Sequence, residues 1–421
     1  LFWSITRLVR SLLKEEKENL SVTDVIIILG SGLVGALAYT FSDTFWFSAV
    51  EGEVYAFSSF LTALVFWMIL RWQDESDTVY GDRWIILIAY IIGLSIGVHL
   101  LNLLCIPAIV LVFYYQKYRT ISLKGAIAAI ALSGLLIVLI LFVYIPGMAD
   151  IGGWFELLFV NALGFPFQTG LIVFLAITFF LLIAGIYRFK KRLINTALWC
   201  ILMLTVGYTT YAVILIRANA NTPLNENAPD NIFALNREQY ESAPLLYGKT
   251  YASEPEYVPE GDYYKVKMKT GGAVYRPNRE EGKYKVIRNK EEVCYTQNML
   301  FSRMWNDRMA SSYKSWPGGT DGAPTQKENL TYFFTYQLNY MYWRYFLWNF
   351  VGRQNDIQGH GEPEHGNWIT GIPLLDNLRL GDQQLLPESL RQNKGHNVFY
   401  ALPLLLGLIG IYWQWMRGKK G

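Results

Sequence analysis

Residues 42–55 read SDTFWFSAVEGEVY and join two apolar runs, residues 25–41 and 57–69. Each run approaches the roughly 20 apolar residues with which a helix crosses a bilayer, so we expect the segment to form a short turn at a membrane face. A charged side chain in lipid is costly, and carboxylates in such a turn should therefore face water, a cavity or a cation. The turn carries three carboxylates: Asp43, Glu51 and Glu53.

The composition indicates an integral membrane protein. Of the 421 residues, 52% are hydrophobic, and the formal net charge is only +3. A soluble domain rarely combines such an apolar fraction with several long uncharged runs. Lys and Arg lie at the ends of apolar runs rather than on one basic face. We therefore expect a lipid bilayer around the chain and no nucleic acid partner.

The apolar runs also predict the order of the membrane spans. Residues 1–6 resemble the last turns of a span, and eight further spans are expected at about 24–48, 54–72, 84–98, 100–116, 124–146, 168–187, 193–216 and 397–416. Loop charge orients them, because cytoplasmic loops are enriched in Lys and Arg. Basic loops fall on one side, whereas the alternate turns at Glu51, at His99 and over residues 147–169 contain no Lys or Arg.

This parity places a large polar insertion outside the cytoplasm. It predicts a helical membrane region (residues 1–216), an outer domain of mixed α and β structure (217–396), and a last membrane helix with its cytoplasmic end (397–421). In the outer domain, alternation over residues 263–275 predicts a hairpin with its turn at the Gly271-Gly272 pair, and residues 283–287 predict another strand. Residues 328–350, rich in Tyr and Trp, predict a helix lying at the outer interface.

Charged and polar residues on the outer turns are the candidates for chemistry. Asp43, Glu51 and Glu53 could hold a cation, act as a general base or bind sugar hydroxyls, and the alternative is a solvated turn. His99 could donate to a phosphate with support from Asn102, and the alternative is a histidine satisfied within a helix break. Three outer arginines suit a phosphate or diphosphate, because the guanidinium binds two oxygens at once, whereas an interfacial Arg can also be only an anchor. These arginines are Arg217, Arg344 and Arg353.

Two histidines and two glutamates lie close together in residues 359–366, GHGEPEHG. Their spacing matches no metal signature, and the Gly and Pro residues indicate a loop. The sequence also contains no phosphate-binding glycine loop and no nucleophile elbow. We therefore predict neither a metal site nor a cofactor.

Several motifs together resemble a known family. They are TFW at 44–46, EVY at 53–55, GVHLLN at 97–102, NREQY at 236–240, PLLYG at 244–248, YWRY at 342–345 and GRQNDIQG at 352–359. In this order they resemble the large inner-membrane proteins of Bacteroidetes that are related to the eukaryotic O-mannosyltransferases of IPT domains. The resemblance covers nearly the whole chain.

The resemblance implies a GT-C type glycosyltransferase of the bacterial inner membrane, with residues 217–396 in the periplasm. The donor would be a polyprenyl-phosphate sugar, and the acceptor a Ser or Thr hydroxyl of a secreted or periplasmic protein. Glu53, His99, Asn102 and Arg217 would line the cavity. The family's acidic first outer loop would lie before Leu1, so the catalytic base is expected upstream and Glu53 is expected to support it.

The expected fold is thus a polytopic α-helical, GT-C-like membrane protein with a mixed α/β periplasmic insertion. Two other functions stay open at this point. A transporter or flippase for a lipid-linked sugar would need polar residues and broken helices near the bilayer midplane, and residues 124–146 and 168–187 show almost none. A non-catalytic scaffold subunit would use the aromatic outer domain as a docking surface.

Overall fold

The computed structural model of the chain describes residues 1–14, 19–118, 122–220, 222–223, 225, 228–235, 256–261, 263–294, 315–316 and 325–416. Contacts divide the chain into two compact units. The first unit comprises Leu1–Pro244 and Gly272–Lys290, and the second comprises Leu245–Gly271 and Glu291–Gly421. The predicted division at residues 217 and 397 stays a prediction.

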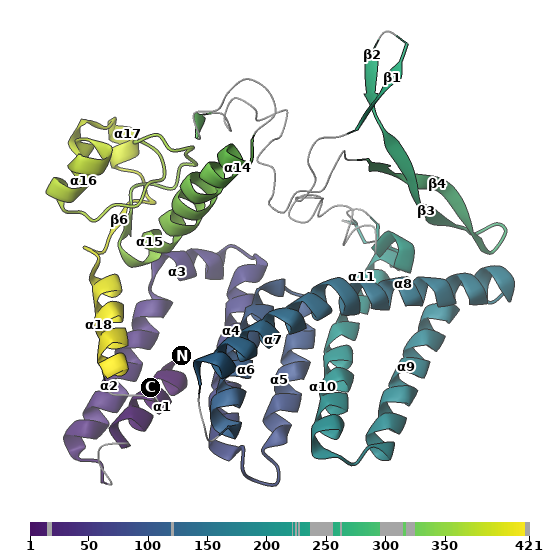
Figure 1. The fold of residues 1–421 in the computed structure, drawn as a ribbon, viewed down its shortest axis with the longest axis horizontal. Coiled ribbons are helices and arrows are strands. Elements are labelled where there is room, and N and C mark those ends of the chain that lie inside the picture. Colours follow the sequence, from purple (N-terminus) through teal and green to yellow (C-terminus); the bar gives the residue numbers. More distant parts are fainter. Residues whose placement is uncertain are drawn as a thin grey trace. The chain divides into compact units, whose positions relative to one another are not determined.

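Apart from residues 272–290, the first unit is built from helices (Figure 1). In chain order they are α1 (Phe2–Lys14), α2 (Val22–Thr40), α3 (Asp43–Val50), α4 (Val54–Glu75), α5 (Asp82–Ile96), the 3-10 turn η1 (Leu100–Leu104), α6 (Cys105–Lys117), α7 (Leu123–Leu139), the π-turn η2 (Ile140–Tyr144), α8 (Ile145–Glu156), the π-turn η3 (Leu157–Ala162), α9 (Thr169–Arg188), α10 (Arg192–Tyr208), the 3-10 turn η4 (Thr209–Tyr211) and α11 (Ala212–Asn219).

Among the described residues, six helices are long and apolar enough to cross a membrane. They are Val22–Thr40, Val54–Glu75, Leu100–Lys117, Leu123–Ala162, Thr169–Arg188 and Arg192–Asn219. The chain is therefore a multi-pass membrane protein. The expected spans at 84–98 and 397–416 correspond to α5 and to α18 (Leu402–Met416), each of 15 residues.

The turn expected at residues 147–169 is wrong in its first part. The helix begun at Leu123 continues to Ala162, a run of 40 residues that is about 60 Å long. Pro146 has no amide hydrogen to donate, and the π-turn η2 ends two residues before it. Figure 1 shows α8 running at an angle to α7, so the helix bends at this point rather than ending.

Close helix packing in the first unit depends on glycine. A Cβ atom on Gly207 of α10 would lie 2.5 Å from the Tyr90 carbonyl oxygen and 2.6 Å from the Leu94 amide nitrogen of α5. A Cβ atom on Gly93 would meet the Leu204 carbonyl oxygen in the same way. The two backbones therefore touch, as small residues allow in membrane helices. Leu61, Val65, Ile88 and Leu103 form the adjoining core between α4, α5 and η1, together with five other buried apolar residues.

The β structure differs in part from the expectation. Strand β1 (Tyr257–Glu260) pairs antiparallel with β2 (Tyr263–Val266), and β3 (Met268–Asn278) pairs with β4 (Lys283–Val293). The predicted strand at 283–287 is confirmed. The predicted turn at Gly271-Gly272 is wrong, because both glycines lie inside β3 and the turn follows at residues 279–282.

The second unit contains one long helical segment and a compact set of short elements. The segment runs through α14 (Gln326–Tyr332), the π-helix η6 (Phe333–Trp343) and α15 (Arg344–Phe350), which confirms the helix predicted at 328–350. Thr325 and Glu328 form a capping box at its start. The remaining elements are β5 (Gly352–Arg353), α16 (Pro373–Leu380), η7 (Gln383–Leu385), α17 (Glu388–Arg391), β6 (Asn397–Val398) and α18.

Candidate functional site

The segment at residues 42–55 contains a short helix of its own. Helix α2 ends at Thr40, eight residues before the predicted end of that span, and α3 lies across the helix ends (Figure 1). Asp43 is partly exposed in the first turn of α3, and Glu53 is the exposed N-cap residue of α4. The Glu53 side chain forms no capping hydrogen bond. Because Glu53 is exposed, its carboxylate can contact another molecule.

His99 lies beside this segment and has a defined orientation. Its ring centroid is 5.6 Å from that of Tyr55, two residues after Glu53. Its Nδ1 accepts a hydrogen bond of 3.1 Å from the Leu101 amide. In the neutral imidazole the proton is then on Nε2, which is left to donate to an anion.

Asn102 lies in η1, three residues after His99. Its side chain is completely buried, and neither amide atom has a hydrogen-bond partner among the described residues. A buried amide without partners carries a desolvation cost of about 1–3 kcal/mol, so its presence needs an explanation. Ser58 of α4 is likewise 2% exposed, with its hydroxyl unpartnered in the described chain.

Arg217 is exposed on α11 and lines a pocket of about 280 Å³. Thr222 and Asn225 also line it, and the Asn225 amide donates to the Ala218 carbonyl at 3.0 Å. The pocket therefore combines one cation with two polar side chains, which suits an anion.

The structure brings only some of these residues together. Tyr55 contacts His99, and a Cβ atom on Gly97 would lie 3.6 Å from both Thr210 and Tyr211, which lead into α11. Among the described residues, no hydrogen bond or ion pair joins Glu53, His99 and Arg217.

Arg344 and Arg353 lie in the second unit and are engaged in its own structure. Arg344 is 2% exposed, donates to the Tyr340 and Gly366 carbonyls at 3.1 and 2.7 Å, and lies over the rings of Tyr340, Tyr345 and Trp348 at 4.3–4.7 Å. Arg353 donates to the Gly395 carbonyl at 2.7 Å. Arg344 in particular is a buried cation held by three aromatic rings.

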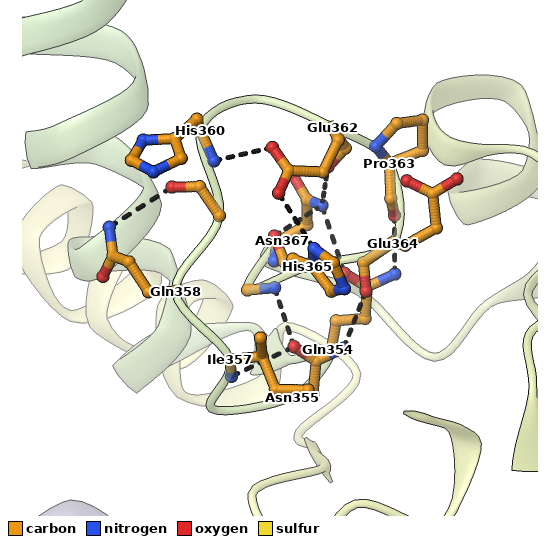
Figure 2. Close-up of polar contacts among 12 residues, drawn as sticks. Gln354, Asn355, Ile357, Gln358, His360, Glu362, Pro363, Glu364, His365 and Asn367 are labelled. Carbon is orange, nitrogen blue, oxygen red and sulfur yellow. Dashed lines mark hydrogen bonds and ion pairs between the residues drawn. The ribbon is translucent and has the colours of Figure 1, made fainter. Parts of the chain in front are cut away.

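The histidine and glutamate loop is held by amide side chains (Figure 2). Asn355 accepts hydrogen bonds from the Ile357 and Gly366 amides at 3.3 and 2.8 Å. The Glu362 carboxylate accepts from the His360 amide at 2.7 Å and lies 2.9 Å from His365 Nδ1. Among the described residues, no group of three or more His, Cys, Asp or Glu side chains could hold a metal ion.

Glu156 is a buried acid that was not among the residues predicted from the sequence. It is 1% exposed at the end of α8 and accepts hydrogen bonds from the Gln168 amide, the Leu171 amide at 3.1 Å and the Tyr284 hydroxyl at 3.0 Å. Asn161 also bonds the Tyr284 backbone through both amide atoms, each at 2.8 Å. A carboxylate in an apolar stretch without Lys or Arg was the available signal, and Asp150 and Glu156 share it.

At the other end of the helices, several cations of the predicted cytoplasmic loops are ion-paired. Arg83 contacts Glu75 at 2.8 Å, and Arg192 contacts Asp82 at 2.7 Å. Arg7 pairs with Asp74 in the same region. Acidic residues thus lie in the same loops as the Lys and Arg residues from which the topology was predicted. They do not change that prediction, because Asp and Glu contribute little to membrane orientation.

The family comparison concerns the helices that carry this site. Residues 1–122 match the model of the protein O-mannosyl-transferase TMEM260 N-terminal domain. Residues 1–122 are related to protein O-mannosyltransferases. The relation inferred from the motifs is thereby confirmed over α1–α6, which include Asp43, Glu53, His99 and Asn102.

The remaining comparisons add no function. Residues 241–334 match a family of unknown function, DUF8416. No curated protein and no solved structure matches the chain. The motifs predicted at 236–240 and 244–248, and the last basic residues at 417–420, lie outside the described residues.

Proposed function

We propose that the chain is part of a membrane glycosyltransferase that moves a sugar from a polyprenyl-phosphate donor to a Ser or Thr hydroxyl of a secreted protein at the periplasmic face. The observation that carries this proposal is the match of residues 1–122 to a protein O-mannosyl-transferase domain. The matched region contains the exposed Glu53 carboxylate and the oriented His99 imidazole. We also assign to the chain a GT-C-like architecture with residues 217–396 in the periplasm.

In the proposed reaction, the acceptor hydroxyl attacks the anomeric carbon while the bond from that carbon to the donor phosphate oxygen breaks. The hydroxyl proton goes to a carboxylate base, and the lipid phosphate leaves with the bonding electrons. Glu53 and Asp43 supply carboxylates on the acceptor side. The Arg217 guanidinium and the His99 Nε2 hydrogen stabilise the charge that grows on the leaving phosphate.

Asn102 has a different proposed role. Because its amide is fully buried, it does not present itself to a ligand as His99 does. It lies three residues after His99 in η1 and packs beneath the outer surface. We assign it to positioning that surface. Arg353 remains a proposed phosphate ligand, whereas the burial of Arg344 favours a structural role for that residue.

The test is the glycan content of secreted proteins from cells that carry Glu53→Gln in the full-length protein, beside wild type and a deletion strain. We expect Glu53→Gln and the deletion to lose the same protein-linked sugar while Glu53→Gln stays in the membrane at the normal amount. Glu280→Gln, at an exposed carboxylate in the β3–β4 turn, is the matched control and should keep the sugar. Unchanged glycosylation in the deletion strain would end the proposal for protein acceptors.

A further inference from the structure

A pocket of about 770 Å³ lies over α10 between the ends of α5 and α9. Helix α10 packs against both neighbours, and a short connection leads from α9 to α10 (Figure 1). Lys190 in this connection lines the pocket. Its walls are apolar along the helices and polar where α9 ends and α10 begins. The apolar wall includes Ile86, Ile183, Trp199 and Leu202.

The depth of this pocket fits one leaflet of a bilayer. Arg192 begins α10, and Leu202 is ten residues further along the same helix, so the lining covers about 15 Å of helix length. A bilayer has a hydrocarbon core of about 30 Å, of which one leaflet is half. The polar end therefore lies at the level of the lipid headgroups, and the apolar wall lies along the acyl chains.

The polar end carries positive charge that the protein does not fully neutralise. Arg192 donates to Asp82 through two nitrogens at 2.7 and 2.8 Å, and the Thr196 hydroxyl donates to the same carboxylate at 3.0 Å. This pairing satisfies Asp82. Lys190 lies at the pocket with its ammonium 5.7 Å from the Tyr187 ring, and no carboxylate pairs with it within the described chain.

The adjoining loop raises this charge further. Residues 188–192 read RFKKR, with four cations and no carboxylate. All four of these basic side chains are exposed. A basic pocket between membrane helices at headgroup depth suits an anionic lipid, because it offers cations to the phosphate and an apolar wall to a chain.

We infer that this pocket binds an anionic phospholipid, with its phosphate at Lys190 and the loop cations and one acyl chain along Ile183 and Trp199. The site is separate from the proposed glycosyl-transfer site, because Asp82 and His99 lie at opposite ends of α5. The inference does not depend on the proposed function. Zwitterionic lipids should bind more weakly, since their net charge is zero.

The test is lipid retention by the purified full chain, measured by native mass spectrometry with phosphatidylglycerol and phosphatidylcholine in turn. We expect phosphatidylglycerol to bind roughly five-fold or more tightly, and Lys190→Gln to reduce that preference by a similar factor. Lys124→Gln removes an exposed cation outside the pocket, at the start of α7, and should leave the preference unchanged.

A second variant tests the apolar wall. Ile183 is 44% exposed, so Ile183→Trp should fold while it narrows the space for a chain, and it should reduce retention of both lipids. Excess inorganic phosphate should not displace phosphatidylglycerol. Equal binding of the two lipids, equal effects of Lys190→Gln and Lys124→Gln, or displacement by phosphate would each overturn the inference. Thermal unfolding of each variant establishes that it is folded.

Discussion

Glu156 is a carboxylate within an apolar helix, and three hydrogen-bond donors make its burial tolerable. Two donors are backbone amides at the start of α9, where the helix dipole also favours a negative charge. The third is the Tyr284 hydroxyl of β4. Burial and the neighbouring Glu156 charge raise the pKa of Tyr284, so that the hydroxyl keeps its proton and stays a donor. One side chain thereby joins the β3–β4 hairpin to the membrane helices.

Removing this hydroxyl should loosen the hairpin without unfolding the helices. Tyr284→Phe leaves Glu156 with two donors, and loss of a hydrogen bond to a charged group costs about 1.5–3 kcal/mol. We expect faster hydrogen exchange of the β4 amides by a corresponding factor, with exchange in α9 less affected. Tyr264→Phe, at a side chain 75% exposed, is the control. Equal protection of β4 in both variants would contradict this account.

Glu362 makes the loop at residues 359–366 sensitive to acid. Burial raises the pKa of Glu362, but hydrogen bonds from His365 and the His360 amide outweigh it and bring the pKa below its ordinary value of 4.5. A depressed carboxyl pKa contributes stability above the unfolded value, and this is lost as pH falls through the folded value. The loop should therefore loosen below pH 4.5. Between pH 5 and 7 the ionisation of Glu362 should not change its stability.

The His360 amide reports this transition, because it donates to Glu362. Its hydrogen-exchange protection, corrected for the intrinsic rate at each pH, should fall in acid for the wild type. Glu362→Gln should remove most of this pH dependence, whereas Glu364→Gln, at an exposed neighbour, should keep it. A pH profile unchanged by Glu362→Gln would show that another group controls the loop.

At the scale of elements, the contact between α5 and α10 depends on the absence of a side chain at Gly207. Gly207→Ala places a methyl group 2.5 Å from the Tyr90 carbonyl, so the two helices must separate. Overpacking of this kind costs about 1–3 kcal/mol. We expect a lower unfolding temperature in detergent. Gly134→Ala in α7, where a Cβ atom meets nothing within 4 Å, should be neutral or slightly stabilising.

The elements predicted best from sequence were those with a single strong signal. Helices α4, α6 and α9 follow from uncharged runs with polar ends. The end of the span predicted near residue 146 was wrong, because Pro146 and Gly147 are also compatible with a bend when a π-turn absorbs the missing hydrogen bond. The Gly271-Gly272 pair permitted a turn without requiring one, and pairing with β4 continued the strand through it.

The site was predictable only where two turns were expected at the same membrane face. The turns at Glu53 and His99 were expected on one side, and the structure places Tyr55 against His99. The burial of Arg344 was not anticipated, although Tyr340 and Trp348 lie four residues before and after it and thus share its helix face. The contact between Glu156 and Tyr284 spans 128 residues, and no local pattern specifies such a pairing.

For the whole molecule, the alternation of charged and uncharged turns makes a prediction about sidedness. Exposed residues at the two helix ends of the first unit should be accessible from opposite sides of the membrane. Lys124 begins α7 at the basic end, and Glu280 lies in the β3–β4 turn, joined to the other end through Tyr284 and Asn161. If residues 217–396 are periplasmic, Glu280 faces the periplasm and Lys124 the cytoplasm.

Cysteine labelling measures this arrangement directly. Glu280→Cys or Lys124→Cys is introduced into a background that carries Cys105→Ser, Cys200→Ser and Cys294→Ser, so that each variant has a single cysteine. A membrane-impermeant maleimide that has crossed only the outer membrane should label Glu280→Cys. It should label Lys124→Cys only after the inner membrane is opened. Both positions are exposed, so labelling reports which side of the membrane the maleimide can reach. Labelling of both cysteines before opening would overturn the topology, and the reverse pattern would place the basic loops outside.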